Sequence, residues 1–270
     1  MPYRLIAVDL DNTLLDDDSQ ISVRNKKAIR KAVNKGVKFV IATGRMFKTS
    51  LPFMQELKLN NDFPIINYHG ALIKSSGSHK ILLHRPLPNK LAIEVVDAVE
   101  KMESHISLFV NDKLYIKEEN EVSSYFQAKT SISMRPVGQL SMFLKQKGIN
   151  PSKISIICWD GRIDEIETKL NELFGDKFSM LQSQPFFLEI TDRKATKGQA
   201  LSWLTAKEGI RAEEVIAFGD GFNDLDMVEF AGLGVAVANA RPEVLRAANL
   251  VTAANNEDGD GEAIEKYILN

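Results

Sequence analysis

The sequence has little cysteine, little net charge and no long hydrophobic run. Its 270 residues contain one cysteine, Cys158, which excludes an intramolecular disulfide and a zinc site built on cysteines. Lys and Arg number 34 against 36 Asp and Glu, so the formal charge of -2 gives no basic field for collecting nucleic acid. No segment has the length of a membrane span or the pattern of a signal peptide. We therefore expect a cytoplasmic protein that binds neither nucleic acid nor membrane.

What the first third of the chain does contain is an alternation of strand and helix patterns. Apolar runs at residues 4–10 and 37–44 indicate buried strands, and residues 63–73 indicate a strand that runs into a turn. Residues 22–36 and 45–59 have the apolar spacing of helices, the first with Ser22 as its N-cap. This order is typical of a parallel sheet with right-handed crossovers.

The middle of the chain departs from this alternation. Two strand patterns, at residues 105–110 and 113–118, meet at Asn111 and Asp112, a polar pair that favours a hairpin. The parallel pattern resumes near residue 197. We therefore predict an α/β protein whose Rossmann-like core is split in sequence around an inserted α+β domain. The predicted core segments are 1–84 and 191–270, and the predicted insert is 85–190.

Polar residues follow the predicted parallel strands at their carboxyl ends, where ligands bind in open α/β sheets. Asp9 and Asp11 follow the first strand. The other groups are Thr43, Gly44 and Arg45 after the second strand, Lys197 and Gly198 at the start of a helix, and Asp220, Asn223 and Asp224 after a late strand. Clustered carboxylates repel one another unless a hard cation neutralises them, and no His or Cys cluster accompanies these. The set therefore predicts a Mg²⁺ site.

The same residues supply what hydrolysis of a phosphate monoester requires. Lys197, the Thr43 hydroxyl and turn amides such as that of Gly44 would bind the phosphate oxygens. Asp9 would attack phosphorus and form an aspartyl phosphate. Asp11 would protonate the leaving alcohol and then take a proton from the attacking water.

The late acidic motif would serve the metal. Asp220 would coordinate Mg²⁺ directly, and Asp224, expected one turn into the next helix, would complete or orient the metal shell. Asn223 would fix the loop by hydrogen bonds.

The sequence resembles the haloacid dehalogenase-like hydrolases, specifically the Cof-type phosphatases of subfamily IIB. The resemblance runs nearly end to end and rests on four motifs, "DLDNTLL", "ATGR", "TKGQAL" and "GDGFNDLDM". It implies an inserted cap domain of the C2B type and a phosphoric monoester hydrolase with the roles given above. It also implies that the backbone carbonyl of Asp11 is a metal ligand.

One position departs from the family pattern. Members usually carry Asn before the Gly-Ala pair of the segment that here is "NYHGALI", and this chain has His69. His69 is expected either to contact substrate or to have a structural role in the loop.

Two other interpretations of the acidic segment at residues 9–20 are less consistent with the sequence. An EF-hand needs glycine and glutamate where the chain has Leu14 and Gln20, and a glycosidase leaves Lys197 and Thr43 without a task. We predict that Asp16–Asp18 form only a solvated acidic loop. The aromatic residues Trp159, Phe186 and Phe187 of the insert are expected to be core side chains, with the lining of a substrate pocket as the open alternative.

Three functions remain open. The favoured one is a Mg²⁺-dependent phosphatase that acts on small phosphomonoesters such as sugar phosphates or phosphorylated cofactors. A phosphotransferase or phosphomutase of the same fold would use the same aspartyl phosphate. A non-catalytic phosphometabolite-binding protein is the third, and it has no need of an acid/base such as Asp11 beside a nucleophile such as Asp9.

Overall fold

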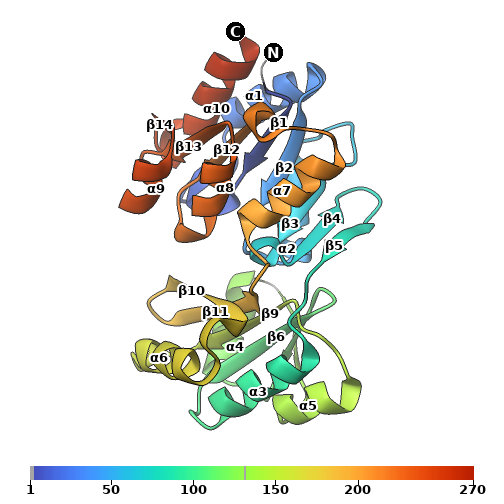
Figure 1. The fold of residues 1–270 in the computed structure, drawn as a ribbon, viewed down its shortest axis with the longest axis vertical. Coiled ribbons are helices and arrows are strands. Elements are labelled where there is room, and N and C mark those ends of the chain that lie inside the picture. Colours follow the sequence, from blue (N-terminus) through green and yellow to red (C-terminus); the bar gives the residue numbers. More distant parts are fainter. Residues whose placement is uncertain (1–2, 131) are drawn as a thin grey trace. The chain divides into compact units, whose positions relative to one another are not determined.

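The computed structural model describes residues 3–130 and 132–270, and this part of the chain divides into two compact units (Figure 1). The first unit extends to Leu83 and resumes at Thr196, and the second is His84–Ala195. The assignment of the second unit as a cap stays a prediction. Among the described residues, no helix is both long and apolar enough to cross a membrane.

The first unit is built on a sheet of eight strands among the described residues, in the order β14-β13-β12-β1-β2-β3-β4-β5. The strands are β1 (Leu5–Val8), β2 (Lys38–Ala42), β3 (Pro64–Asn67), β4 (Leu72–Ser75), β5 (Ile81–His84), β12 (Val215–Gly219), β13 (Leu233–Val237) and β14 (Leu250–Thr252). Pairing is parallel from β14 to β3 and antiparallel between β3 and β4. The predicted α/β class with a parallel, Rossmann-like core is confirmed.

Helices precede or follow these strands along the chain. They are α1 (Val23–Asn34), α2 (Phe47–Glu56), α7 (Lys197–Lys207), α8 (Leu225–Phe230), α9 (Pro242–Ala247) and α10 (Gly259–Ile264). The predicted N-cap of α1 is confirmed, because the Ser22 hydroxyl accepts the Asn25 N–H at 3.1 Å. All four residues of β1 are buried, as expected for a central strand covered on both faces.

The second unit holds a sheet of six strands within the described range, in the order β10-β11-β9-β6-β7-β8. The strands are β6 (His105–Val110), β7 (Lys113–Ile116), β8 (Met134–Pro136), β9 (Lys153–Ile157), β10 (Phe178–Gln184) and β11 (Phe187–Asp192). The helices are α3 (Asn89–Glu100), α4 (Glu121–Thr130), α5 (Leu140–Lys147) and α6 (Ile163–Phe174). Apolar side chains of α3, α5 and α6 form one hydrophobic core with residues of β6, β9 and β11.

Several details of the second unit bear on the sequence predictions. The hairpin of β6 and β7 is confirmed, and Asn111 and Asp112 adopt φ of 50° and 56°, as a tight two-residue hairpin turn requires. Strand β8 and helix α5 were not predicted, because three and eight residues give too short a periodic signal. The expectation that Trp159 is a core side chain is wrong, because it is 47% exposed.

A buried ion pair lies inside the second unit. The Lys153 ammonium donates to Glu189, and the two side chains are only 6% and 7% exposed. They come from β9 and β11, which are neighbours in the sheet. This pair serves below as a reference for the charges of the first unit.

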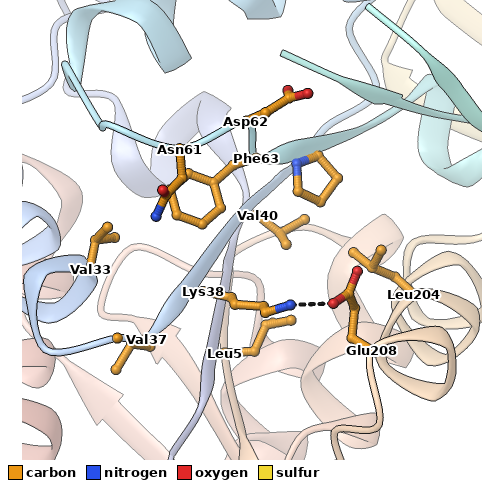
Figure 2. Close-up of a pocket in the computed structure, with 12 residues that line it drawn as sticks. Leu5, Val33, Val37, Lys38, Val40, Asn61, Asp62, Phe63, Leu204 and Glu208 are labelled. Carbon is orange, nitrogen blue, oxygen red and sulfur yellow. Dashed lines mark hydrogen bonds and ion pairs between the residues drawn. The ribbon is translucent and has the colours of Figure 1, made fainter. Parts of the chain in front are cut away.

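A pocket of about 280 Å³ lies at the amino ends of the parallel strands in the first unit (Figure 2). Its lining includes the first residues of three strands, Leu5, Lys38 and Pro64, and the Lys38 ammonium donates to Glu208 across it. Open α/β sheets bind their ligands at the carboxyl ends of the strands. The pocket is therefore at the wrong edge of the sheet to contain the predicted site.

Candidate active site

Three neighbouring strands bring the predicted residues to one edge of the sheet. β1 pairs with β2 on one side and with β12 on the other, all in parallel. Asp9 directly follows β1, Thr43 directly follows β2, and Asp220 directly follows β12. The carboxyl ends of adjacent parallel strands lie side by side, so residues more than 200 positions apart become neighbours.

Lys197 connects two of the carboxylates. It is the first residue of α7, a helix whose N-cap Thr196 accepts the Gln199 N–H. Its side chain is fully buried, and Nζ donates to Oδ1 of Asp9 and to Oδ1 of Asp224, both at 2.5 Å. A lysine is rarely buried unless it is paired, and here two carboxylates pair with it.

Asp9, Asp220 and Asp224 form a group that suits a metal ion. One carboxylate oxygen from each lies within 4.8 Å of the others. Asp9 and Asp224 are buried, and Asp220 is partly buried. All the donors are oxygens, which is the ligand set that Mg²⁺ prefers.

Asp224 sits differently from the prediction. It was expected one turn into a helix, but it lies in a short 3-10 turn, Phe222–Asp224, just before α8. Its Oδ2 accepts the N–H groups of Asp220 and Gly221 at 3.2 and 3.0 Å. A Cβ at Gly219 would lie 2.4 Å from the Cβ of Asp224, so only glycine permits this close approach. Asp224 thus fixes the loop while also holding Lys197.

The charges of the cluster do not balance. With all groups ionised, Asp9, Asp220 and Asp224 carry three negative charges against one positive charge on Lys197. Burial raises the pKa of Asp9 well above its usual value; Lys197 opposes this, and the neighbouring carboxylates reinforce it. Burial and Asp224 raise the pKa of Asp220 to about 6. The excess of two negative charges equals the charge that a divalent cation neutralises.

Lys197 stays charged in this environment. Burial lowers the pKa of its ammonium, but Asp224 and Asp9 outweigh burial and raise the pKa above the usual lysine value. The charged Lys197 ammonium and the excess of carboxylates therefore lie together in one buried group.

Asp11 points away from this group. It belongs to the irregular turn Leu10–Leu14, and its side chain is about half exposed. Arg45 donates to it twice, from Nε to Oδ2 at 2.9 Å and from Nη2 to Oδ1 at 2.5 Å. This two-point contact orients the Asp11 carboxylate.

Two threonine hydroxyls also make hydrogen bonds with the predicted site residues. Thr43 is buried, and its Oγ1 accepts the Arg45 N–H at 3.1 Å, so its own proton is left to donate elsewhere. Thr13 donates from Oγ1 to Oδ1 of Asp220 at 2.9 Å. The sequence reasoning assigned no role to Thr13, although the D-x-D-x-T spacing placed it on the same turn as the two aspartates.

Asp260, a further acid that the sequence reasoning did not single out, lies in α10. Neither of its carboxylate oxygens has a hydrogen-bond partner among the described residues, and the side chain is buried. Burial, with a contribution from Asp220, raises the pKa of Asp260 to about 7.

Comparison with known proteins gives the family. A model of the haloacid dehalogenase-like hydrolases matches residues 6–264. The chain belongs to this hydrolase family. It is 32% identical over 269 residues to "Putative phosphatase YxeH" of Bacillus subtilis, with 99% of each chain covered.

Further members of the family extend the likeness. The 5-amino-6-(5-phospho-D-ribitylamino)uracil phosphatase YitU of B. subtilis is 31% identical, with 98% of this chain and 97% of that one covered. The crystal structure of a haloacid dehalogenase-like hydrolase from Bacteroides thetaiotaomicron superposes with a TM-score of 0.88 at 30% identity. The superposition covers 98% of this chain and 99% of the Bacteroides chain. The expected family and the expected hydrolase class are confirmed.

Proposed function

We propose that this haloacid dehalogenase-like hydrolase is a Mg²⁺-dependent phosphatase of small phosphomonoesters, acting through an aspartyl phosphate on Asp9. The observation that carries the proposal is the buried group of Asp9, Asp220 and Asp224 with Lys197 inserted between two of its members. An excess of carboxylates calls for a divalent cation, and an adjacent fixed ammonium suits an anionic substrate.

The metal would be held by Asp9, Asp220 and Asp224, together with the backbone carbonyl of Asp11. When bound, Mg²⁺ supplies positive charge that offsets the carboxylates and polarises the phosphoryl group. The oxygen donors and the charge of the group fit such a cation.

The phosphate would be bound by Lys197, the Thr43 hydroxyl and the Gly44 amide. Lys197 already donates to Asp9, so it would hold a phosphate oxygen beside the attacking carboxylate. The Thr43 hydroxyl proton is available because Thr43 Oγ1 accepts from Arg45. Fixed donors around the phosphate lower the barrier by positioning and by charge stabilisation.

Asp9 then attacks phosphorus, and the bond between phosphorus and the ester oxygen breaks as the alcohol leaves. Asp11 gives the leaving oxygen its proton and later takes one from the water that hydrolyses the aspartyl phosphate. Arg45 restricts the Asp11 carboxylate to one orientation through its two hydrogen bonds.

Small phosphate esters, such as sugar phosphates or phosphorylated cofactors, are the proposed substrate class. The name of the relative YitU supports this, since its substrate is a ribitylamino-uracil that carries one phosphate.

Hydrolysis of p-nitrophenyl phosphate tests the proposal. We expect turnover with Mg²⁺ and almost none with EDTA, since charge balance and phosphate binding both require the cation. Asp9→Asn should lower kcat by at least about a thousandfold, because it removes the nucleophile. The matched control is Asp18→Asn, which makes the same change at an exposed aspartate and should leave kcat unchanged.

Two results would contradict the proposal. Activity that survives in Asp9→Asn would remove Asp9 as nucleophile, and activity that persists in EDTA would remove the metal. Turnover that depends on an added bisphosphate activator would instead identify a phosphomutase.

A further inference from the structure

His69 is bonded through its backbone to the turn that carries the proposed phosphate ligands. It lies in the short turn Tyr68–Gly70 after β3, with φ of 58°, an uncommon value for a residue other than glycine. Its N–H donates to the Thr43 carbonyl at 3.2 Å, and the Tyr68 N–H donates to the Arg45 carbonyl at 3.2 Å. The two turns are therefore held against each other by main-chain hydrogen bonds, and the His69 side chain starts from a fixed point.

The imidazole of His69 packs directly on Gly44. A Cβ built on Gly44 would lie 2.3 Å from Cε1 and 2.7 Å from Nε2 of the ring. The ring thus occupies the space of the side chain that Gly44 lacks, and His69 is only 7% exposed. Gly44 cannot move toward the ring, and the ring cannot rotate freely past Gly44.

The same ring reaches the loop that carries the proposed metal ligands. Nδ2 of Asn223 lies 3.3 Å from Nδ1 of His69. An amide NH₂ group only donates, so this contact is a hydrogen bond in the tautomer of His69 whose Nδ1 carries no proton. Asn223 is the residue before Asp224, and Asp224 accepts from the N–H groups of Asp220 and Gly221.

We propose that His69 is a positioning residue whose ring sets the separation between the Thr43–Gly44 turn and the Asp220–Asp224 loop. The inference rests on the proposed function, since a phosphate on the Thr43–Gly44 turn and a metal held by Asp220 and Asp224 can act on each other only at a fixed separation. Small displacements of positioned groups reduce turnover more than ground-state binding. Substitutions can test the hydrogen bond between His69 and Asn223 separately from the packing of the ring on Gly44.

Two substitutions separate the hydrogen bond from the packing. His69→Phe keeps a ring over Gly44 but removes the acceptor, and His69→Asn loses the ring but keeps an acceptor near the position of Nδ1. We expect His69→Phe to lower kcat on p-nitrophenyl phosphate about tenfold and to raise KM by no more than about fivefold. His69→Asn should retain kcat within about threefold of the wild type. The reverse order of the two variants would overturn the proposal, because packing alone would then explain the effect.

Asn223→Ala provides a second route that does not depend on a substitution at His69. If the hydrogen bond acts as proposed, Asn223→Ala should lower kcat about tenfold in the wild type and less than about twofold in the His69→Phe background. Independent, multiplicative losses would show that the two side chains do not act as a unit, and would contradict the proposal.

Calorimetric binding of inorganic phosphate distinguishes a failure of this inference from a failure of the proposed function. Mg²⁺ should tighten phosphate binding in the wild type, and this enhancement should shrink about fivefold in His69→Phe while phosphate binding without Mg²⁺ changes little. An unchanged enhancement would refute the role of His69 even if the enzyme is active. A wild type that hydrolyses no phosphomonoester but shows the expected loss in His69→Phe would refute the proposed function and leave the positioning role standing.

Discussion

Both units of the molecule bury a lysine against a carboxylate, but among the described residues only the first unit gathers three carboxylates that could hold a metal ion. In the second unit the Lys153 ammonium donates to Glu189. In the first unit Lys197 lies between Asp9 and Asp224, with Asp220 in the same group. A buried ammonium and a carboxylate that bind each other offset each other's charge. A buried group with an excess of carboxylates needs a cation from outside the chain.

Crowding of buried carboxylates accompanies raised pKa values in the first unit. Burial raises the pKa of Asp9, and nearby carboxylates add to this against the opposing effect of Lys197. Perturbed pKa values of this kind cluster at functional sites. The first unit thus differs from the Lys153–Glu189 pair in gathering three carboxylates around one lysine, since the lysine is buried in both.

Removing the lysine from the unbalanced group should have the largest effect. Lys197→Met should lower kcat on p-nitrophenyl phosphate by about a thousandfold, since it removes a fixed positive charge beside the phosphate and the nucleophile. It should also increase the rise in unfolding temperature that Mg²⁺ produces, because the carboxylates then repel one another without any cation. Steady-state kinetics and thermal unfolding with and without Mg²⁺ check the two effects. A smaller Mg²⁺ response than in the wild type would contradict the charge argument.

Breaking the Lys153–Glu189 pair should affect stability, and Mg²⁺ should not restore it. Glu189→Gln removes the negative charge to which the buried Lys153 ammonium donates and should lower the free energy of unfolding by about 3–5 kcal/mol. The double variant Lys153→Met with Glu189→Gln should recover most of the loss. Denaturant unfolding of the single and double variants measures this, and recovery by Mg²⁺ alone would contradict the distinction between the units.

The smallest expected effect concerns Asp260, and it depends on pH. The folded pKa of about 7 lies above the ordinary 3.8, so the folded state holds a proton that the unfolded state releases. Stability is therefore lost as pH rises from about 4 to about 7, by at most about 4 kcal/mol, and stays low above pH 7. Asp260→Asn should remove this loss.

Thermal unfolding in EDTA across this pH range tests the Asp260 prediction. We expect Asp260→Asn to match the wild type near pH 4 and to be more stable at pH 8. A variant that is less stable at pH 8 would show that Asp260 makes a stabilising contact as an anion.

The sequence predicted those parts of the site that are local in the chain. Asp9 and Asp11 follow an apolar run, and Asp220 and Asp224 follow another, so the strand ends that carry them were readable from periodicity. The parallel core followed from the same alternation. Short elements without a full period, such as β8 and α5, gave no comparable signal.

The sequence did not predict contacts between residues that are far apart along the chain. The bonds of Thr13 to Asp220 and of His69 to Asn223 join residues 207 and 154 positions apart. They depend on how loops bend, which local pattern does not determine. Asp224 was misplaced for the same reason, since its carboxylate organises a 3-10 turn instead of standing on a regular helix.

The most direct test of the account is the pre-steady-state release of nitrophenolate by Asp11→Asn. An aryl leaving group needs little protonation, so Asp9 should still be phosphorylated, while hydrolysis of the aspartyl phosphate should slow without its base. The account predicts a burst of about one nitrophenolate per protein in the presence of Mg²⁺, and no burst in the double variant with Asp9→Asn. Steady turnover by Asp11→Asn without a burst, or a burst that survives Asp9→Asn, would contradict it.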